Sequence, residues 1–191
     1  MGRIVVTEFI SLDGVVEDPG GAENYRHGGW SFAFDRSDAG TKFKLDELFA
    51  AEAQLLGRRT YEGFAAAWPS YQDPDGFADK MNGMPKFVVS KMLTEATWNN
   101  SSILSGDPVE EITALKQRLA GDLLVGGSVQ LVQLLLAHGL VDELRLMVFP
   151  VLLGSGKRLF PDADADAPTR LGVVSDERVG DVQLLVLRPA A

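Results

Sequence analysis

The sequence predicts a three-layer α/β domain with a mixed, mostly parallel central sheet and antiparallel strands at its C-terminal end. Through the first 140 residues or so, short apolar runs alternate with segments of helical spacing, the pattern of strands joined by crossover helices. After residue 142 the pattern changes to strands alone, over 142–149, 170–178 and 181–188. The 191 residues contain no segment typical of a linker, so we expect one domain over 1–191.

The predicted strands are apolar runs that end in turns. The first strand covers 3–10 and leads into the turn Ser11-Leu12-Asp13-Gly14. A Gly- and Asp-rich loop over 15–40 follows, and loops of this length are often functional. Further strands are expected at 53–57, 86–90, 102–104 and 122–125, and the turn Gly180-Asp181 joins the last two strands.

The predicted helices are marked by apolar spacing and by residues that favour helix ends. Helical spacing covers 42–52, and a shorter helix is expected near 76–82. Thr60 is the expected N-cap of a helix that Pro69 ends, and Asp107 is the expected N-cap of another. The inner face of the helix after Thr60 is expected to consist of Tyr61, Phe64, Ala65 and Trp68.

Composition narrows the function classes. The net charge of −9 argues against a nucleic-acid-binding protein, which normally carries a basic face. Cysteine is absent, which excludes disulfides, thiolate metal sites and a cysteine nucleophile, and we expect no metal site. No apolar run reaches the roughly 20 residues that a membrane span needs, and the N-terminal strand pattern is too short for a signal peptide. We therefore expect a cytoplasmic protein.

The turn Gly57-Arg58-Arg59-Thr60 joins a buried strand to a helix and is the first candidate binding site. The start of a helix presents unpaired N–H groups, and guanidinium groups can meet a phosphate with two hydrogen bonds each. Arg58 and Arg59 would suit the 2′-phosphate that separates NADP from NAD. The alternative interpretation is an ordinary helix start preceded by two solvated arginines.

A second turn of the same kind is Gly126-Gly127-Ser128, ahead of an apolar helix over 128–138. Paired glycines let the backbone approach a ligand, and the helix dipole favours an anion there. The alternative is a tight turn with a serine cap. Ser90 and Lys91 follow another buried strand, so they could join the same edge, although a solvated lysine there is equally ordinary. The G-x-G-x-x-G fingerprint is absent, which disfavours an ordinary Rossmann domain.

In this order, these motifs resemble the dihydrofolate reductase fold. The branch resembled is the C-terminal reductase domain of the bifunctional riboflavin biosynthesis enzyme, RibD, and its stand-alone relatives. Ser11-Leu12-Asp13-Gly14 and the stretch 150–156 look like signatures of that branch, and Gly57-Arg58-Arg59-Thr60 is similar to the Gly-Arg-x-Thr of dihydrofolate reductases. The resemblance covers nearly the whole chain.

The resemblance implies NADPH binding at the carboxyl edge of the sheet and hydride transfer to a nitrogen heterocycle, either pterin-like or a ribosylamino-pyrimidine. It implies that Trp30 lies near the substrate, and we expect Asp13 beside the pocket as the candidate catalytic residue. Residues implied to hold the adenosine phosphates and the pyrophosphate are Gly57, Arg58, Arg59, Thr60, Ser90, Lys91, Gly126, Gly127 and Ser128.

One departure from the pattern affects the choice of substrate. Dihydrofolate reductases carry an acid on the helix before the Gly-Arg-x-Thr turn, and counting back to that place reaches Thr41, with Asp38 and Asp46 nearby. The sequence therefore leaves two functions open: an NADPH-dependent reductase, and a nucleotide-binding module without catalysis. A nucleotide-dependent transferase or hydrolase is a weaker third, because no carboxylate pair stands near the turns. The apolar C-terminal strands are consistent with a homodimer.

Overall fold

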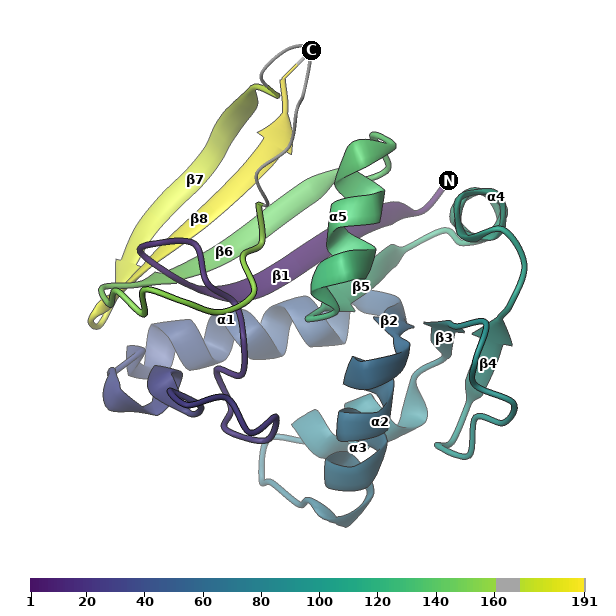
Figure 1. Ribbon diagram of the computed structural model, residues 1–191, viewed down its shortest axis with the longest axis horizontal. Coiled ribbons are helices and arrows are strands. Elements are labelled where there is room, and N and C mark those ends of the chain that lie inside the picture. The colour runs from purple at the N-terminus through teal and green to yellow at the C-terminus, as the bar shows by residue number, and fades with distance from the viewer. Residues whose placement is uncertain (161–168, 191) are drawn as a thin grey trace.

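A single eight-stranded sheet forms the centre of the computed structural model, which describes residues 1–160 and 169–190 (Figure 1). The sheet order is β4-β3-β2-β5-β1-β6-β8-β7, in which β8 runs antiparallel to both neighbours and all other pairs are parallel. The strands are β1 (Arg3–Ser11), β2 (Ala51–Gly57), β3 (Lys86–Val89), β4 (Ser101–Leu104), β5 (Asp122–Gly126), β6 (Glu143–Phe149), β7 (Leu171–Val179) and β8 (Val182–Pro189).

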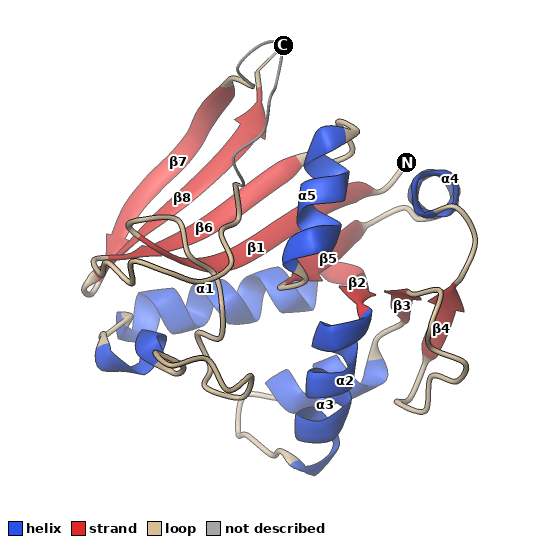
Figure 2. Ribbon diagram, in the orientation of Figure 1, coloured by secondary structure: helices blue, strands red, loops and turns tan. Residues whose placement is uncertain are grey.

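Helices cover both faces of this sheet, which makes three layers (Figure 2). On one face α4 and α5 pack through residues such as Ile112 and Val132, and on the other face α1 to α3 pack through residues such as Leu48 and Tyr61. The α-helices are α1 (Ser37–Ala50), α2 (Arg58–Ala67), α3 (Phe77–Gly83), α4 (Pro108–Arg118) and α5 (Val129–Ala137), and short 3-10 helices are η1 (Trp30–Ala33) and η2 (Trp68–Ser70).

The alternation of side chains along β1 decides which layer each residue joins. Ile4, Val6 and Ile10 enter the cluster under α4 and α5, whereas Val5 enters the cluster under α1 to α3. This period of two is expected for a central strand that is buried on both faces. Glu8 occupies a position in the Ile4 series and is also buried.

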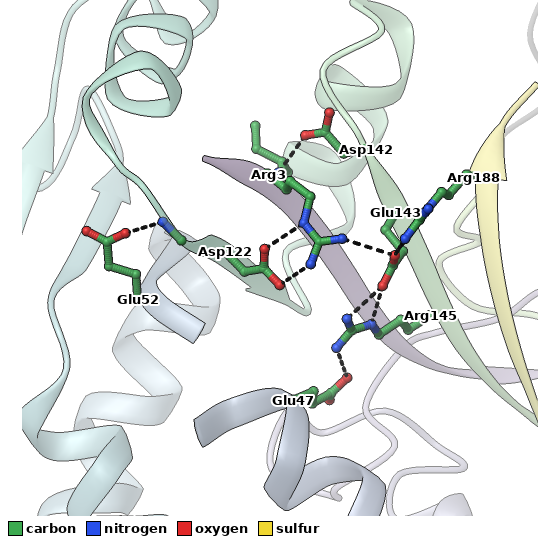
Figure 3. Close-up of polar contacts among 10 residues, drawn as sticks. Arg3, Glu47, Glu52, Asp122, Asp142, Glu143, Arg145 and Arg188 are labelled. Carbon is green, nitrogen blue, oxygen red and sulfur yellow. Dashed lines mark hydrogen bonds and ion pairs between the residues drawn. The ribbon is translucent and has the colours of Figure 1, made fainter. Parts of the chain in front are cut away.

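An ion-pair network fixes the amino edge of the sheet (Figure 3). The Arg3 guanidinium donates two hydrogen bonds to Asp122, of 2.8 and 2.7 Å, and so joins β1 to β5. Glu143 of β6 accepts hydrogen bonds from Arg145 at 2.7 Å and from Arg188 of β8 at 2.8 Å. Burial alone would raise the pKa of Glu143, but the hydrogen bonds from Arg188 and Arg145 outweigh it and lower that pKa below its ordinary value.

The predicted fold class is confirmed, and most predicted elements are present with ends shifted by a few residues. Two expectations were wrong. Thr60 is not an N-cap, because α2 already begins at Arg58 and its N-cap is Gly57. The loop predicted over 15–40 contains η1 and the first turn of α1, where the short, polar and Gly-containing run from Ser37 gives little helical periodicity. Among the described residues, no helix combines the length and the apolar character that crossing a membrane requires.

Candidate binding site at the carboxyl ends of the strands

The site lies where the chain connections of two adjacent parallel strands diverge. From β1 the chain passes through α1 to β2 on one side, and from β5 it passes through α5 to β6 on the other side (Figure 1). The β1–β5 pairing ends at Thr7 and Gly126, whereas β1 continues to pair with β6 as far as Ser11. In open α/β sheets, ligands bind at the carboxyl ends of strands at such a switch point.

A hydrogen bond joins the two predicted turns at this place. The Gly57 backbone N–H donates to the Ser128 Oγ at 2.8 Å. Ser128 has a left-handed backbone with φ of 70°, and its side chain does not cap α5. The serine hydroxyl thus connects the end of β2 to the turn after β5, a role that differs from the serine cap considered from the sequence.

Gly127 makes a second close approach between the two turns. Its φ of 72° lies in the left-handed region that favours glycine, and a Cβ there would stand 3.3 Å from both Oγ1 and Cγ2 of Thr60. The turn therefore keeps its backbone bare beside the first turn of α2. A bare backbone beside a helix start is the arrangement that phosphate-binding turns use, so these residues fit the phosphates of a dinucleotide.

The two arginines of the first turn differ in their surroundings. Arg58 is half-buried, and its Nη1 donates to both carboxylate oxygens of Glu62 at 2.9 Å, one helical turn further along α2. Arg59 is exposed, and the described part of the chain offers it no ion-pair partner. Arg59 can therefore reach a ligand without breaking an existing contact, whereas Arg58 would have to share its guanidinium with Glu62 or leave it.

Ser90 and Lys91 lie next to the first turn, because Val89 pairs with Gly57 at the end of the β2–β3 ladder. The Ser90 hydroxyl already accepts hydrogen bonds from the backbone N–H groups of Met92, at 3.1 Å, and Leu93, at 2.9 Å. It thus holds the following turn, and Ser90 is itself buried. Lys91 is exposed at the same sheet edge.

Asp13 joins two loops. Its carboxylate accepts hydrogen bonds from Ser11 Oγ at 2.6 Å and from the backbone N–H groups of Leu153 and Gly154 at 3.2 and 2.8 Å. The hydrogen bond from Ser11, with help from those N–H groups, lowers the pKa of Asp13 to about 2. A carboxyl group with this pKa is ionised at neutral pH, so its chemistry suits loop positioning and does not suit proton donation.

Trp30 packs inside the protein. Its indole is only 7% exposed, donates from Nε1 to the Glu17 carbonyl at 2.8 Å and stacks edge-on against Phe149 at 5.2 Å. The neighbouring residue Phe32 is exposed and borders an open cavity of about 560 Å³ at the start of α1. This cavity is lined by Ser31, Phe32, Phe34, Asp35, Arg36, Ser37, Asp38 and Thr41.

Glu8 is a buried carboxyl group at the switch point that was not among the predicted site residues. Glu8 is 6% exposed, and its Oε1 has no hydrogen-bond partner. Burial is the main cause that raises the pKa of Glu8 to about 8, against smaller opposing effects of Lys44 and of the Gly127 backbone N–H. The sequence contained one signal for its burial, because Glu8 alternates in step with the inward-facing apolar residues Ile4, Val6 and Ile10 of β1.

A second buried polar group lies on the opposite face of β1. Thr7 Oγ1 donates to Glu47 Oε1 at 2.9 Å and accepts a hydrogen bond from Lys44 Nζ at 2.8 Å, and Lys44 also pairs with Glu47. Arg145 approaches the other Glu47 oxygen at 3.6 Å. These charges neutralise one another within the protein. Across the described ranges, no three His, Asp or Glu side chains are grouped closely enough to hold a metal ion.

Comparison with known proteins identifies the family. The model of the RibD C-terminal domain matches residues 3–185. The chain belongs to the RibD C-terminal domain family. YyaP, an uncharacterized protein of Bacillus subtilis, is 28% identical to this chain over 163 residues, which cover 84% of this chain and 81% of YyaP.

Solved structures agree with this membership at the level of the fold. A putative riboflavin biosynthesis protein from Shewanella sp. PV-4 superposes with a TM-score of 0.75 at 21% identity, over 99% of both chains. Dihydrofolate reductase from Enterococcus faecalis, solved in complex with NADP(H), superposes with a TM-score of 0.58 at 17% identity, over 99% of this chain and 97% of the reductase. The chain therefore has the dihydrofolate reductase-like fold.

Proposed function

We propose that this protein is an NADPH-dependent reductase that transfers a hydride to a small nitrogen heterocycle. The observation that carries the proposal is the Gly57–Ser128 hydrogen bond, which places the arginine turn and the glycine turn at one sheet edge. Ligand binding at this edge is the general behaviour of open α/β sheets. The likeness in fold to a reductase solved with NADP(H) supports the same cofactor class.

The residues of both turns would divide the work of binding the cofactor. Arg58, Arg59 and Thr60, with Ser90 and Lys91, would hold the adenosine phosphates. Gly126, Gly127 and Ser128 would hold the pyrophosphate through N–H groups, while the Gly57 N–H stays bonded to Ser128. When bound, NADPH supplies the hydride, and the protein contributes position and exclusion of water.

The substrate would lie on the side of the cavity at the start of α1. Asp35, Asp38 and Thr41 line that cavity. By the resemblance, the place at which dihydrofolate reductases carry an acid falls near Thr41. A hydroxyl group at that place, with the acids at Asp35 and Asp38 instead, favours a substrate other than dihydrofolate. The likeness in fold to the putative riboflavin biosynthesis protein from Shewanella supports a ribosylamino-pyrimidine as the substrate class. Trp30 would act here through packing, by holding η1, and Asp13 through the loops that it joins.

Cofactor titration tests the binding half of this proposal. We expect the nicotinamide fluorescence of NADPH to rise when NADPH binds the protein. The fluorescence of NADH should rise much less. The double substitution Arg58→Ala and Arg59→Ala should weaken NADPH binding by roughly ten- to a hundredfold, the effect of losing charged hydrogen bonds, and should leave NADH nearly unchanged. Arg170→Ala, an exposed arginine before β7, is the matched control and should bind like the wild type. Equal losses for both nucleotides would contradict the 2′-phosphate assignment.

Turnover tests the catalytic half. Oxidation of NADPH is followed at 340 nm with a ribosylamino-pyrimidine and, separately, with dihydrofolate. We expect oxidation with the first substrate only. If the protein binds NADPH tightly but NADPH is not oxidised in the presence of either substrate, the alternative function is favoured, which is a nucleotide-binding module of the same fold.

We also propose that the protein forms a homodimer through its last strand pair. The edge strand β7 is exposed over most of its length, including Val173 at 64% and Val174 at 50%. An exposed strand edge is a template for pairing with another chain, and the apolar first half of β7 offers such an edge. Sedimentation should give twice the chain mass, and Val173→Lys should shift it to the monomer. The cytoplasmic location stays a prediction.

A further inference from the structure

Glu8 is a carboxyl group in a place where the sheet otherwise carries apolar side chains. It lies one residue beyond Thr7, where the β1–β5 ladder ends, and its side chain shares the face of Ile4, Val6 and Ile10. A buried polar atom without a partner costs free energy, and native proteins keep few of them. Oε1 of Glu8 is such an atom, so it is free to bond with a group from outside the chain.

The surroundings of Glu8 point to the glycine turn. Thr7 pairs with Gly126 at the end of the β1–β5 ladder, so Glu8, the next residue, lies beside the turn proposed to hold the pyrophosphate. The nearby backbone N–H of Gly127 acts to lower the pKa of the Glu8 carboxyl group. A carboxylate at this place would repel a phosphate, whereas a carboxylic acid could donate a hydrogen bond to it. Burial raises the pKa of Glu8 to about 8, so the acid form predominates at neutral pH.

The charged groups of the elements around Glu8 are mostly engaged in ion pairs within the protein. Lys44 is the charged group that acts on Glu8 through space. The sequences of α5 and of the turn 126–128 contain no ionisable side chain. The pairs in the neighbouring elements are Lys44 with Glu47, Arg145 with Glu47, Glu17 with Lys157, Asp13 with Arg158, and Arg58 with Glu62. Arg59, at the start of α2, has no ion-pair partner among the described residues.

We propose that Glu8 belongs to the dinucleotide site and that its carboxylic acid form donates a hydrogen bond to the ligand lying against Gly126 and Gly127. This inference rests on the proposed function, because it takes the reduced dinucleotide as the ligand. Its consequence is that binding consumes a proton whenever Glu8 is ionised beforehand. Affinity must then fall as the pH rises, since the ionised form lacks the donor and repels phosphate.

Calorimetry on the wild-type protein tests the proton directly. NADPH is titrated at pH 8.5 in two buffers that differ in ionisation enthalpy. With a midpoint near pH 8, we expect an uptake of about 0.8 proton per NADPH bound, and an uptake near zero at pH 6.5. The dissociation constant should rise about tenfold between pH 7 and pH 9. An affinity that is the same at pH 7 and pH 9 would overturn the inference.

Substitutions assign the proton to Glu8. Glu8→Gln keeps a donor and an acceptor but cannot ionise, so we expect wild-type affinity at pH 7, no loss at pH 9 and no proton uptake. Glu8→Leu removes the donor and should weaken binding about tenfold at pH 7. Glu177→Gln, on exposed β7, should behave as the wild type throughout. Proton uptake that persists in Glu8→Gln would contradict the assignment, whereas no binding of NADPH by the wild type would contradict the proposed function itself.

Discussion

The Ser128 hydroxyl group accepts a hydrogen bond from the Gly57 backbone N–H at 2.8 Å, although the two residues stand 71 positions apart. The pairing of β2 with β5 ends at Gln54 and Leu124, so no strand hydrogen bonds connect the last residues of these two strands. The Gly57–Ser128 contact joins them instead. It holds the arginine turn and the glycine turn in a fixed relation before any ligand arrives. Preorganisation of this kind lowers the entropy that binding has to overcome.

Ser128→Ala tests this contact. Alanine retains the left-handed backbone strain and removes only the hydroxyl, so the free energy of unfolding should fall by about 1 kcal/mol, the value of one hydrogen bond. NADPH affinity should fall as well, because the two turns lose their connection. Urea unfolding and fluorescence titration measure the two effects. Ser102→Ala, at an exposed position of β4, serves as the control, and an equal change in both variants would argue against the contact.

Gly127→Ala tests the bare backbone of the second turn. The positive φ and the 3.3 Å approach of a Cβ to Thr60 should together cost about 1–2 kcal/mol of folding free energy. The added methyl group should also obstruct the ligand. Gly63→Ala provides the contrast, since nothing lies within 4 Å of its Cβ in α2 and the change should stabilise the helix by up to about 1 kcal/mol. Unfolding curves that move in the same direction for both would contradict this prediction.

The pKa of Glu8 makes a prediction about the ligand-free protein. The folded carboxyl group keeps its proton until about pH 8, whereas the unfolded chain releases it near 4.5, so wild-type stability declines as the pH rises between these values. Glu8→Gln does not titrate. Relative to the wild type, it should therefore gain stability from pH 5 to pH 8, with an upper bound of about 5 kcal/mol from the linkage relation. A stability difference that is constant with pH would show that the pKa is ordinary.

Glu143→Gln tests the amino edge of the sheet. The change removes the charge that Arg145 and Arg188 share, and breaking a buried ion pair on one side costs about 3–5 kcal/mol. The lowered pKa of Glu143 means that its contribution is present above about pH 4.5 and disappears as acid protonates the folded carboxylate. The stability gap to the wild type should thus be large at pH 7 and should narrow as the pH falls below 4.5. A gap that persists in acid would point to packing as its cause.

The order of strands and helices could be predicted because local signals determine it. Apolar runs, glycine turns and the Asp107 cap lie within a few residues of the elements that they specify. The two glycine turns could be placed at one edge because parallel strands share a carboxyl edge. The Ser128 contact could not be predicted, since the same serine next to a helix equally fits an N-cap and only the packed strands decide between them.

Buried charges could not be predicted either, because only the packed chain decides which groups become their partners. Lys86 is fully buried, and its Nζ donates to the carbonyl oxygens of Asn82, Met84 and Asn99 at 2.8–3.0 Å. Those carbonyls come from the end of α3 and from a later loop, so the sequence around Lys86 does not reveal them. Glu8 differs, because its inward position in the alternation of β1 was visible, although its burial beside Gly127 was not.

The contacts of Asp13 have a further consequence for motion. The Leu12 N–H donates to the Val151 carbonyl and the Val16 N–H donates to the Lys157 carbonyl, while the Asp13 carboxylate accepts from the Gly154 N–H. The chain after β1 and the chain after β6 are thus joined by both backbone and side-chain hydrogen bonds. Neither segment can lift away by itself without breaking several of these bonds. Opening and closing over the strand ends should accordingly occur as one concerted displacement of both segments, with a single relaxation rate shared by probes placed on either.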